Sequence, residues 1–349
     1  MSTLDQPLLI ANVNYHVGHW VAIYVAEEQG FFKQEGLSRY EYERSGLLPG
    51  PSESQTLGLA IKEHGVDIAT AVDTESAIIQ RVQGADVYIV GGWRYTPFLK
   101  WYGSKHITDI SKLRGGKIGV RENSADGGGL VEFFIEEALK DAGVDPATEV
   151  EMVHDPVFGY RNNPAHIDML RCGRVNAITS SPPFSDELEK EGYPVILDPN
   201  VVFPRRPGKV TVAPRRTIEQ RSDELKAYFR AITRTFWFMR DVNNFQYLHD
   251  LEARLRKLTH NEDEQRLFIA SAPDRVDSWA LPMDGGIERD ALERIIQEMV
   301  KRGRLERPIS VQEVFKDDAV GDAYREVSTR GELRPAFNKA MAAVEKYGF

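Results

Sequence analysis

Two histidines and an arginine are the side chains in this sequence best suited to chemistry on an anion. His16 and His19 lie three residues apart in NYHVGHW, and Arg94 lies in the segment WRY. A histidine can donate a hydrogen bond or move a proton near neutral pH, and a guanidinium can hold a carboxylate or sulfonate with two hydrogen bonds. If the protein is an enzyme, we predict these three as catalytic residues, with Glu75 or Glu122 as a second proton carrier.

The alternatives for these residues are structural. The histidines could be partly exposed loop residues, and Arg94 could form a surface ion pair. A metal site would need a third ligand, and no HExxH or equivalent spacing supplies one. Cys172 is the single cysteine of the chain, which excludes an intramolecular disulfide and a cysteine-built zinc site. We therefore predict no metal and no cofactor, and we expect Cys172 to be a small buried apolar residue.

A second anion site is expected in RENSADGGG, at residues 121–129, which follows the strand-like KIGV and opens the helix-like LVEFFIEEAL. Free backbone N–H groups at a helix start attract an anion, and Ser124 adds a hydroxyl. Simple capping of the helix by Ser124 or Asp126 is equally open. The glycine spacing matches neither GxGxxG nor GxxxxGK[ST], so a nucleotide site has little support.

The remaining candidates are residues that follow the predicted strands, since ligands of open α/β sheets lie outside the carboxyl ends of the strands. Six aromatic candidates could form flat walls for an aromatic ligand, although each alone is more often a core residue: Trp20, Trp93, Tyr95, Phe158, Tyr160 and Phe184. The predicted ligand-binding residues are Asn14, Tyr15, His16, Trp20, Ser45, Asp73, Thr74, Trp93, Arg94, Tyr95, Asn123, Ser124, His154, Phe158, Tyr160, Ser181 and Phe184.

The elements that must position these residues alternate between β-rich runs and helical patterns, which is typical of βαβ units and mainly parallel sheets. From about Ser222 the pattern is helical, with no further convincing strand. The predicted strands are residues 7–14, 38–45, 66–72, 86–93, 117–122, 149–155, 175–181, 193–198 and 209–214. The helical patterns between them are residues 19–36, 53–65, 74–84, 127–143, 165–174 and 184–192.

The chain has 349 residues, which exceeds the size at which one core usually divides into two domains. Two Pro/Gly-rich breaks, GGWRYTPFLKW and DPNVVFPRRPGK, interrupt the strand pattern. They predict crossovers near 93–98 and 200–210. Lobe 1 would then be discontinuous, with residues 1–95 plus 210–349, and lobe 2 would be the insert 96–209.

Several segments, in order, resemble solute-binding proteins of the nitrate/sulfonate/thiamine-precursor type. They are NYHVGHWVAIYVAEEQGFFKQEGL, VDIATAVDTESA, VGGWRYTPF, ITDISKLRGGKIGV, LRCGRVNAITSSPPFSDEL, SDELKAYFRAITRTFWFM and RLERPISVQEVF. The resemblance covers nearly the full length. It implies an α/β fold of the type II periplasmic-binding-protein class: two lobes around a ligand cleft, with a helical C-terminal part.

Charge and hydropathy exclude some classes of binding partner. The net charge is −9 and the pI is near 5.5, so the protein repels a polyphosphate backbone and we expect no nucleic acid partner. No apolar run is long enough to span a bilayer, so we expect no membrane insertion. The first residues lack a basic region followed by an apolar one, which predicts a cytoplasmic protein as written. A start codon assigned too far downstream would instead make it periplasmic or extracytoplasmic.

The resemblance implies an ABC-transporter-type solute-binding protein. It would take a small organic anion, expected to be an aromatic carboxylate or sulfonate, and its partner would be an ABC permease. The alternative is a cytosolic, cofactor-independent lyase or hydrolase on the same fold, decarboxylase- or desulfinase-like, with an acid/base mechanism. NYHVGH stands where the desulfinases of this family have a reactive cysteine, and the cysteine-rich stretch of the thiamine-pyrimidine synthases is absent. A ligand sensor without chemistry is the third possibility.

Overall fold

The computed structural model describes residues 6–13, 17–43, 53–95, 100–121, 128–155, 163–180, 184–257 and 281–347. Contacts divide these residues into two compact units. Unit 1 holds those up to Tyr95 and from Pro207 onward, and unit 2 holds those between them. The sequence puts the second boundary after Lys209, but strand pairing already begins at Pro207, which joins residues 207–209 to unit 1. That the units act as separate domains stays a prediction.

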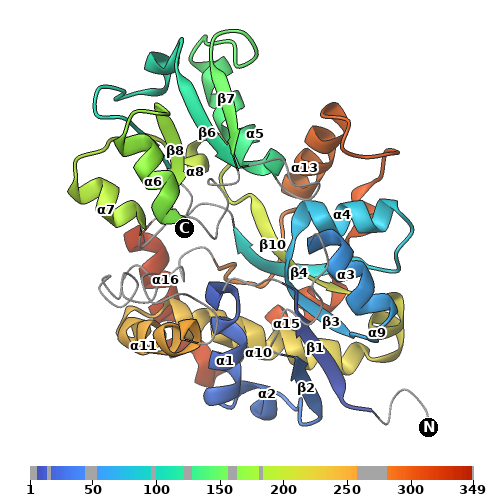
Figure 1. Ribbon diagram of the computed structural model, residues 1–349. Helices are drawn as coiled ribbons and strands as arrows, with labels where there is room; N and C mark the ends of the chain where they lie inside the picture. The colour runs from blue at the N-terminus through green and yellow to red at the C-terminus, as the bar shows by residue number, and fades with distance from the viewer. Residues whose placement is uncertain are drawn as a thin grey trace. The chain divides into compact units, whose positions relative to one another are not determined.

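Unit 1 is built on a five-stranded sheet with the order β2-β1-β3-β10-β4 (Figure 1). β1 pairs in parallel with β2 and β3, and β10 lies antiparallel between β3 and β4. β1 and β3 are almost wholly buried apolar runs, as expected for strands covered on both faces. The strands are β1 (Leu8–Asn12), β2 (Tyr40–Glu43), β3 (Ile68–Asp73), β4 (Tyr88–Tyr95) and β10 (Pro207–Ala213).

Unit 2 has its own five-stranded sheet, with the order β7-β6-β8-β5-β9. β6 pairs in parallel with β7 and β8, and β5 lies antiparallel between β8 and β9. Both sheets therefore have one reversed strand in the fourth position. The strands are β5 (Lys100–Gly103), β6 (Lys117–Arg121), β7 (Glu151–Asp155), β8 (Ala177–Ser180) and β9 (Val195–Leu197).

Helices make up most of the remaining described chain, and from Ser222 onward its described residues form no strand beyond a single bridge between Ile89 and Phe315. The helices of unit 2 are η3 (Ile110–Leu113), α5 (Gly128–Asp141), α6 (Asn163–Arg171), α7 (Phe184–Lys190) and α8 (Pro199–Val202). Those of unit 1 are η2 (Val17–His19), α1 (Val21–Glu28), α2 (Phe31–Gln34), α3 (Glu53–Lys62), α4 (Thr74–Val82), α9 (Arg215–Gln220), α10 (Ser222–Arg240), η6 (Val242–Asn244), α11 (Phe245–Arg256), α13 (Arg289–Lys301), α14 (Val311–Val314), α15 (Asp318–Ser328), η9 (Gly331–Leu333) and α16 (Arg334–Tyr347).

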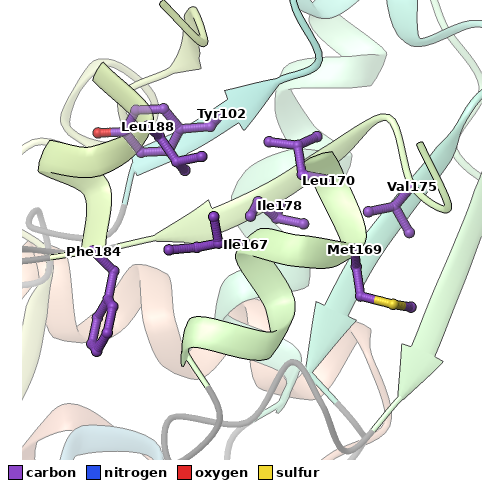
Figure 2. Packing of buried hydrophobic residues seen from close by; sticks show 8 residues of the cluster. All are labelled: Tyr102, Ile167, Met169, Leu170, Val175, Ile178, Phe184 and Leu188. Carbon is purple, nitrogen blue, oxygen red and sulfur yellow. The ribbon is translucent and has the colours of Figure 1, made fainter. Parts of the chain in front are cut away.

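Each unit has an apolar core of its own. In unit 1 the long helix α10 buries Tyr228, Phe229, Phe236 and Trp237. In unit 2 the helices α6 and α7 pack on Tyr102 of β5 and Ile178 of β8 (Figure 2). The apolar spacing of α10 and of α6 is what predicts these inward faces.

Candidate functional site

The carboxyl ends of β1, β3 and β4 share one edge of the sheet in unit 1 with the amino end of β10, because β10 runs the opposite way. The residues at this edge, which we call the unit 1 edge, are Asn12, His19, Asp73, Thr74, Glu75, Arg94, Tyr95, Pro207 and Lys209. Ligands of open α/β sheets bind at such an edge. It is therefore the candidate site.

Two of the predicted catalytic residues meet at the unit 1 edge. His19 ends η2, the short helix that follows β1, and its Nδ1 lies 3.5 Å from Nη1 of Arg94 near the end of β4. Their exposed fractions are only 6% and 4%. A guanidinium is charged at any physiological pH and carries five N–H donors, so this pair is a buried hydrogen-bonding and cationic group.

Asp73 and Glu75, the acids of the unit 1 edge, each lie beside a lysine or an arginine. The Asp73 carboxylate is 3.5 Å from Nζ of Lys209, which lies opposite both Asp73 and Arg94 in the strand register. Glu75, predicted as a proton carrier, is buried in the first turn of α4 and accepts from Nη1 of Arg304. Glu75 is thus held in an ion pair, which argues against a mobile proton carrier.

Thr74 is also engaged within unit 1. Its hydroxyl donates to the carbonyl oxygen of Pro207 at 2.8 Å, which ties the start of α4 to the start of β10. Thr74 is fully buried. This bond fixes the backbone around Asp73, so the contribution of Thr74 is positioning rather than an exposed hydroxyl.

The aromatic candidates divide between core and edge. Trp93 is buried and meets the Phe236 ring edge-on at 5.7 Å, so it packs in the core of unit 1. Phe184, at the start of α7, belongs to the apolar cluster of unit 2 (Figure 2). Trp20 is buried at the start of α1, while Tyr95 is half-buried at the end of β4. Trp93 and Phe184 as ligand walls thus find no support.

His154 occupies a different setting, on the edge strand β7 of unit 2. Its Nδ1 lies 3.2 Å from the Glu132 carboxylate on α5, and its side chain is 39% exposed. A histidine paired with a carboxylate can contact a ligand, but the negative carboxylate beside it disfavours an anion. His154 as an anion contact therefore stays a prediction.

The other predicted site residues lie outside the described residues and stay predictions: Asn14, Tyr15, His16, Ser45, Glu122, Asn123, Ser124, Phe158, Tyr160 and Ser181. Among the residues that the structure does describe, no three His, Cys, Asp or Glu side chains gather as a metal site would require.

Sequence reasoning missed two cations that pair with acids of the unit 1 edge, Lys209 and Arg304. The signal for Lys209 was available: it ends the basic segment PRRPGK in an acidic protein and is the first residue of a predicted strand. Arg304 follows α13, 229 residues after its partner Glu75, and no local pattern reports a pairing over that separation.

The expectation that Cys172 is buried is wrong. Cys172 is exposed, just after the last residue of α6. The chain turns there through Gly173, whose φ is 75°, and the Cys172 thiol lies 3.6 Å from the carbonyl oxygen of Met169 in the last turn of the helix. The apolar spacing of α6 reaches only as far as Leu170.

Two five-stranded sheets, each with its reversed strand in the fourth position, define the two-lobed periplasmic-binding-protein fold, and solved structures agree. The aliphatic sulphonate binding protein SsuA from Escherichia coli matches at a TM-score of 0.65 with 14% identity, over 89% of this chain and 92% of that chain. The nitrate-binding protein NrtA from Synechocystis PCC 6803 matches at 0.61 with 12% identity, over 93% and 89%.

The desulfurization enzyme DszB, in a mutant form with biphenyl-2-sulfinic acid, matches at a TM-score of 0.63 with 15% identity, over 92% of this chain and 99% of that chain. These identities establish the fold alone. The family model described as NMT1/THI5 like matches residues 18–241, and the chain belongs to this family. No curated protein matches the sequence. In the described part of the chain, no helix has both the length and the apolar character to cross a membrane.

Proposed function

We propose that this protein binds a small organic anion, an aromatic carboxylate or sulfonate, as the solute-binding component of an ABC-type importer. The observation that carries the proposal is the buried Arg94 beside His19 at the unit 1 edge. A buried guanidinium is stabilised by an anion, and it matches the planar oxygens of a carboxylate or the oxygens of a sulfonate.

The names of two proteins of the same fold support a negatively charged ligand. SsuA is named for an aliphatic sulphonate and NrtA for nitrate, both of which are anions. The aromatic part of the proposal has less support, namely Tyr95 at the end of β4 and the predicted Phe158 and Tyr160. Closure of two lobes on the anion and delivery to a permease belong to the proposal as well.

The second candidate function is cleavage of an acid group from the same ligand, and the observation that favours it is His19 within 3.5 Å of Arg94. In a decarboxylation, Arg94 would hold the carboxylate. The electron pair of the breaking C–C bond would stay on the ring carbon, which takes a proton from His19 as CO2 leaves. DszB, which has the same fold, is named as a desulfurization enzyme.

Calorimetry and mass spectrometry together distinguish the two functions. The purified protein is titrated with benzoate, benzenesulfonate, benzenesulfinate, propanesulfonate and nitrate, and each mixture is analysed for products. We expect at least one anion to bind unchanged. Loss of CO2 or sulfite from a compound, abolished in His19→Gln, would establish the lyase instead.

Arg94→Gln is the decisive variant, because it keeps a polar side chain and removes the charge. We expect affinity for the bound anion to fall roughly 10- to 100-fold, the range for losing a hydrogen bond to a charged group. Arg254→Gln is the matched control, since Arg254 is an exposed arginine of unit 1 that pairs with Glu28. Equal losses in both variants, or none in Arg94→Gln with its fold retained by circular dichroism, would contradict the proposal.

The cellular location is part of the proposal, and cell fractionation with an antibody measures it. Periplasmic or extracytoplasmic protein agrees with import, whereas cytoplasmic protein agrees with the lyase or with a sensor.

A further inference from the structure

Two polar side chains of unit 2 are buried without a hydrogen-bond partner. Both ring nitrogens of His166 and the hydroxyl of Ser180 lack a partner among the residues that the structure describes. The exposed fractions of His166 and Ser180 are 3% and 1%. A buried polar group without a partner costs stability, and nearly all such groups in folded proteins are satisfied. These two therefore call for a ligand-based or structural reason.

The topology places both residues at one edge of the sheet. α6 connects two strands that both run parallel to β6, so it begins at the carboxyl edge, returns to the amino edge and leads into β8. His166 lies in the first turns of α6, and Ser180 is the last residue of β8. Both residues therefore belong to the carboxyl edge of unit 2, the kind of edge at which ligands of such sheets bind.

The packing places both residues in one layer. Met169 and Leu170 follow His166 by three and four residues on α6, so the three share a helix face. Ser180 follows Ile178 by two residues on β8, so these two share a sheet face. Met169, Leu170 and Ile178 belong to one apolar cluster, which Figure 2 shows between α6 and the sheet. His166 and Ser180 thus lie where this apolar layer ends, toward the carboxyl edge.

The chemistry of the two groups is polar and uncharged. Burial lowers the pKa of His166 to about 4, so its imidazole is neutral at physiological pH and offers one donor and one acceptor. A serine hydroxyl likewise donates and accepts. Such groups pair with a hydroxyl, amine or carbonyl.

We propose that His166 and Ser180 form an uncharged polar subsite of unit 2, and that this subsite binds an uncharged hydrogen-bonding group of an organic anion. The inference rests on the proposed function, in which this protein binds an organic anion. It narrows the ligand class from any aromatic carboxylate or sulfonate to those with a hydroxyl, amino or carbonyl substituent.

The experiment compares matched ligands on matched variants by calorimetry. The probes are benzoate and benzenesulfonate, each with its three monohydroxy isomers. We expect at least one hydroxy isomer to bind wild-type protein about tenfold more tightly than its parent, the effect of one or two good hydrogen bonds. That preference should fall to less than twofold in Ser180→Ala and in His166→Phe.

Ser104→Ala is the matched control. The Ser104 hydroxyl is also buried and without a hydrogen-bond partner in the described residues. It follows Gly103, which pairs with Ala177 at the start of β8, so it lies at the opposite edge of the same sheet. We expect Ser104→Ala to keep the full preference. Ser180→Ala should melt no lower than wild type, since it removes a hydroxyl that has no partner.

Each outcome decides one question. Binding of the parent anions with no preference for any hydroxy isomer overturns the subsite and leaves the proposed function standing. A preference that survives in Ser180→Ala also overturns the subsite, even if His166→Phe does not fold. If no anion binds at all, the proposed function fails and the subsite fails with it.

Discussion

Glu35 is a buried acid whose charge is compensated by several arginines. Its carboxylate, 4% exposed, accepts hydrogen bonds from Arg230 and Arg234 on α10 and from Arg330 just before η9. Three elements distant in sequence therefore meet on one carboxylate. Burial by itself raises the pKa of Glu35, but the hydrogen bonds and charges of Arg234 and Arg330 outweigh it and hold the pKa below 4.5.

We predict that Glu35→Gln lowers the free energy of unfolding by about 3–5 kcal/mol at pH 7, the cost of breaking a buried ion pair on one side. Because the folded pKa of Glu35 is depressed, its contribution is present above the unfolded pKa and is lost as pH falls through the folded value. The gap between wild type and Glu35→Gln should therefore narrow below pH 4.5. Urea denaturation across pH measures both effects.

Glu28→Gln is the control for Glu35→Gln. Glu28 pairs with Arg254 on the surface, and exposed pairs contribute about 0–1 kcal/mol. A loss in Glu35→Gln no larger than in Glu28→Gln, or a gap that does not change with pH, would show that the three arginines do not depend on this carboxylate.

Sequence reasoning names polar candidates most readily at the ends of strands. Arg94 and His19 were both predicted as site residues, and the structure brings them together at the unit 1 edge, while their role stays a prediction. The alternation of a strand puts neighbouring residues on opposite faces, but only the packed helices decide which face is the core, so Trp93 could not be assigned in advance. His166 was overlooked although its spacing from Met169 and Leu170 places it on an apolar helix face.

Two glycines of β4, Gly91 and Gly92, allow this strand to pack closely against its neighbours. The backbone N–H of Gly92 donates to the carbonyl oxygen of Gly285 at 2.7 Å. A Cβ at Gly92 would lie 2.4 Å from the carbonyl oxygen of Gly286, and one at Gly91 would lie 2.5 Å from the Phe229 ring. The pair GG in VGGW is therefore required by close approach of the 285–286 backbone and of α10.

We predict that Gly92→Ala lowers the free energy of unfolding by about 1–3 kcal/mol, because the added methyl collides with a backbone atom that cannot move aside. Thermal and urea denaturation measure the loss. Gly331→Ala is the control, since no heavy atom lies within 4 Å of a Cβ there. Similar stability of the two variants would mean that the 285–286 segment yields at little cost.

All nine strands predicted from the sequence are present, most as short apolar runs between turn residues and β2 as an alternation of Tyr and Glu. β5 was missed. Its four residues follow Pro97 in a segment interpreted as a break, and only pairing with β8 and β9 makes it a strand. The expected helix over 19–36 is two helices, α1 and α2, because Gly30 adopts a φ of 69° between them.

The order of the strands within each sheet cannot be predicted from sequence patterns alone. Alternating strands and helices predict mainly parallel sheets, and four strands of each sheet do run the same way. The insertion of β10 between β3 and β4 joins residues more than 100 positions apart. Such pairing depends on long-range packing, for which a local pattern carries no signal.

A truncation after Arg206 tests this arrangement. All five strands of unit 2 precede that residue, whereas the sheet of unit 1 lacks β10. We predict that limited proteolysis of the fragment 1–206 leaves residues 100–206 protected and cuts between 53 and 95. Full-length protein should resist in both ranges. Equal protection of both ranges in the fragment would show that β4 is held without β10.

The central position of β10 also sets an order of events during synthesis. The ribosome completes every strand of unit 2 before it makes the strand that joins β3 to β4. The sheet of unit 1 therefore keeps an unpaired edge while about a hundred further residues are synthesised. Unpaired strand edges can pair with the wrong strand or with another chain. If unit 2 folds slowly, this edge stays exposed for longer. Mutations in unit 2 should therefore lower the yield of soluble protein by more than their effect on the stability of the folded protein would predict.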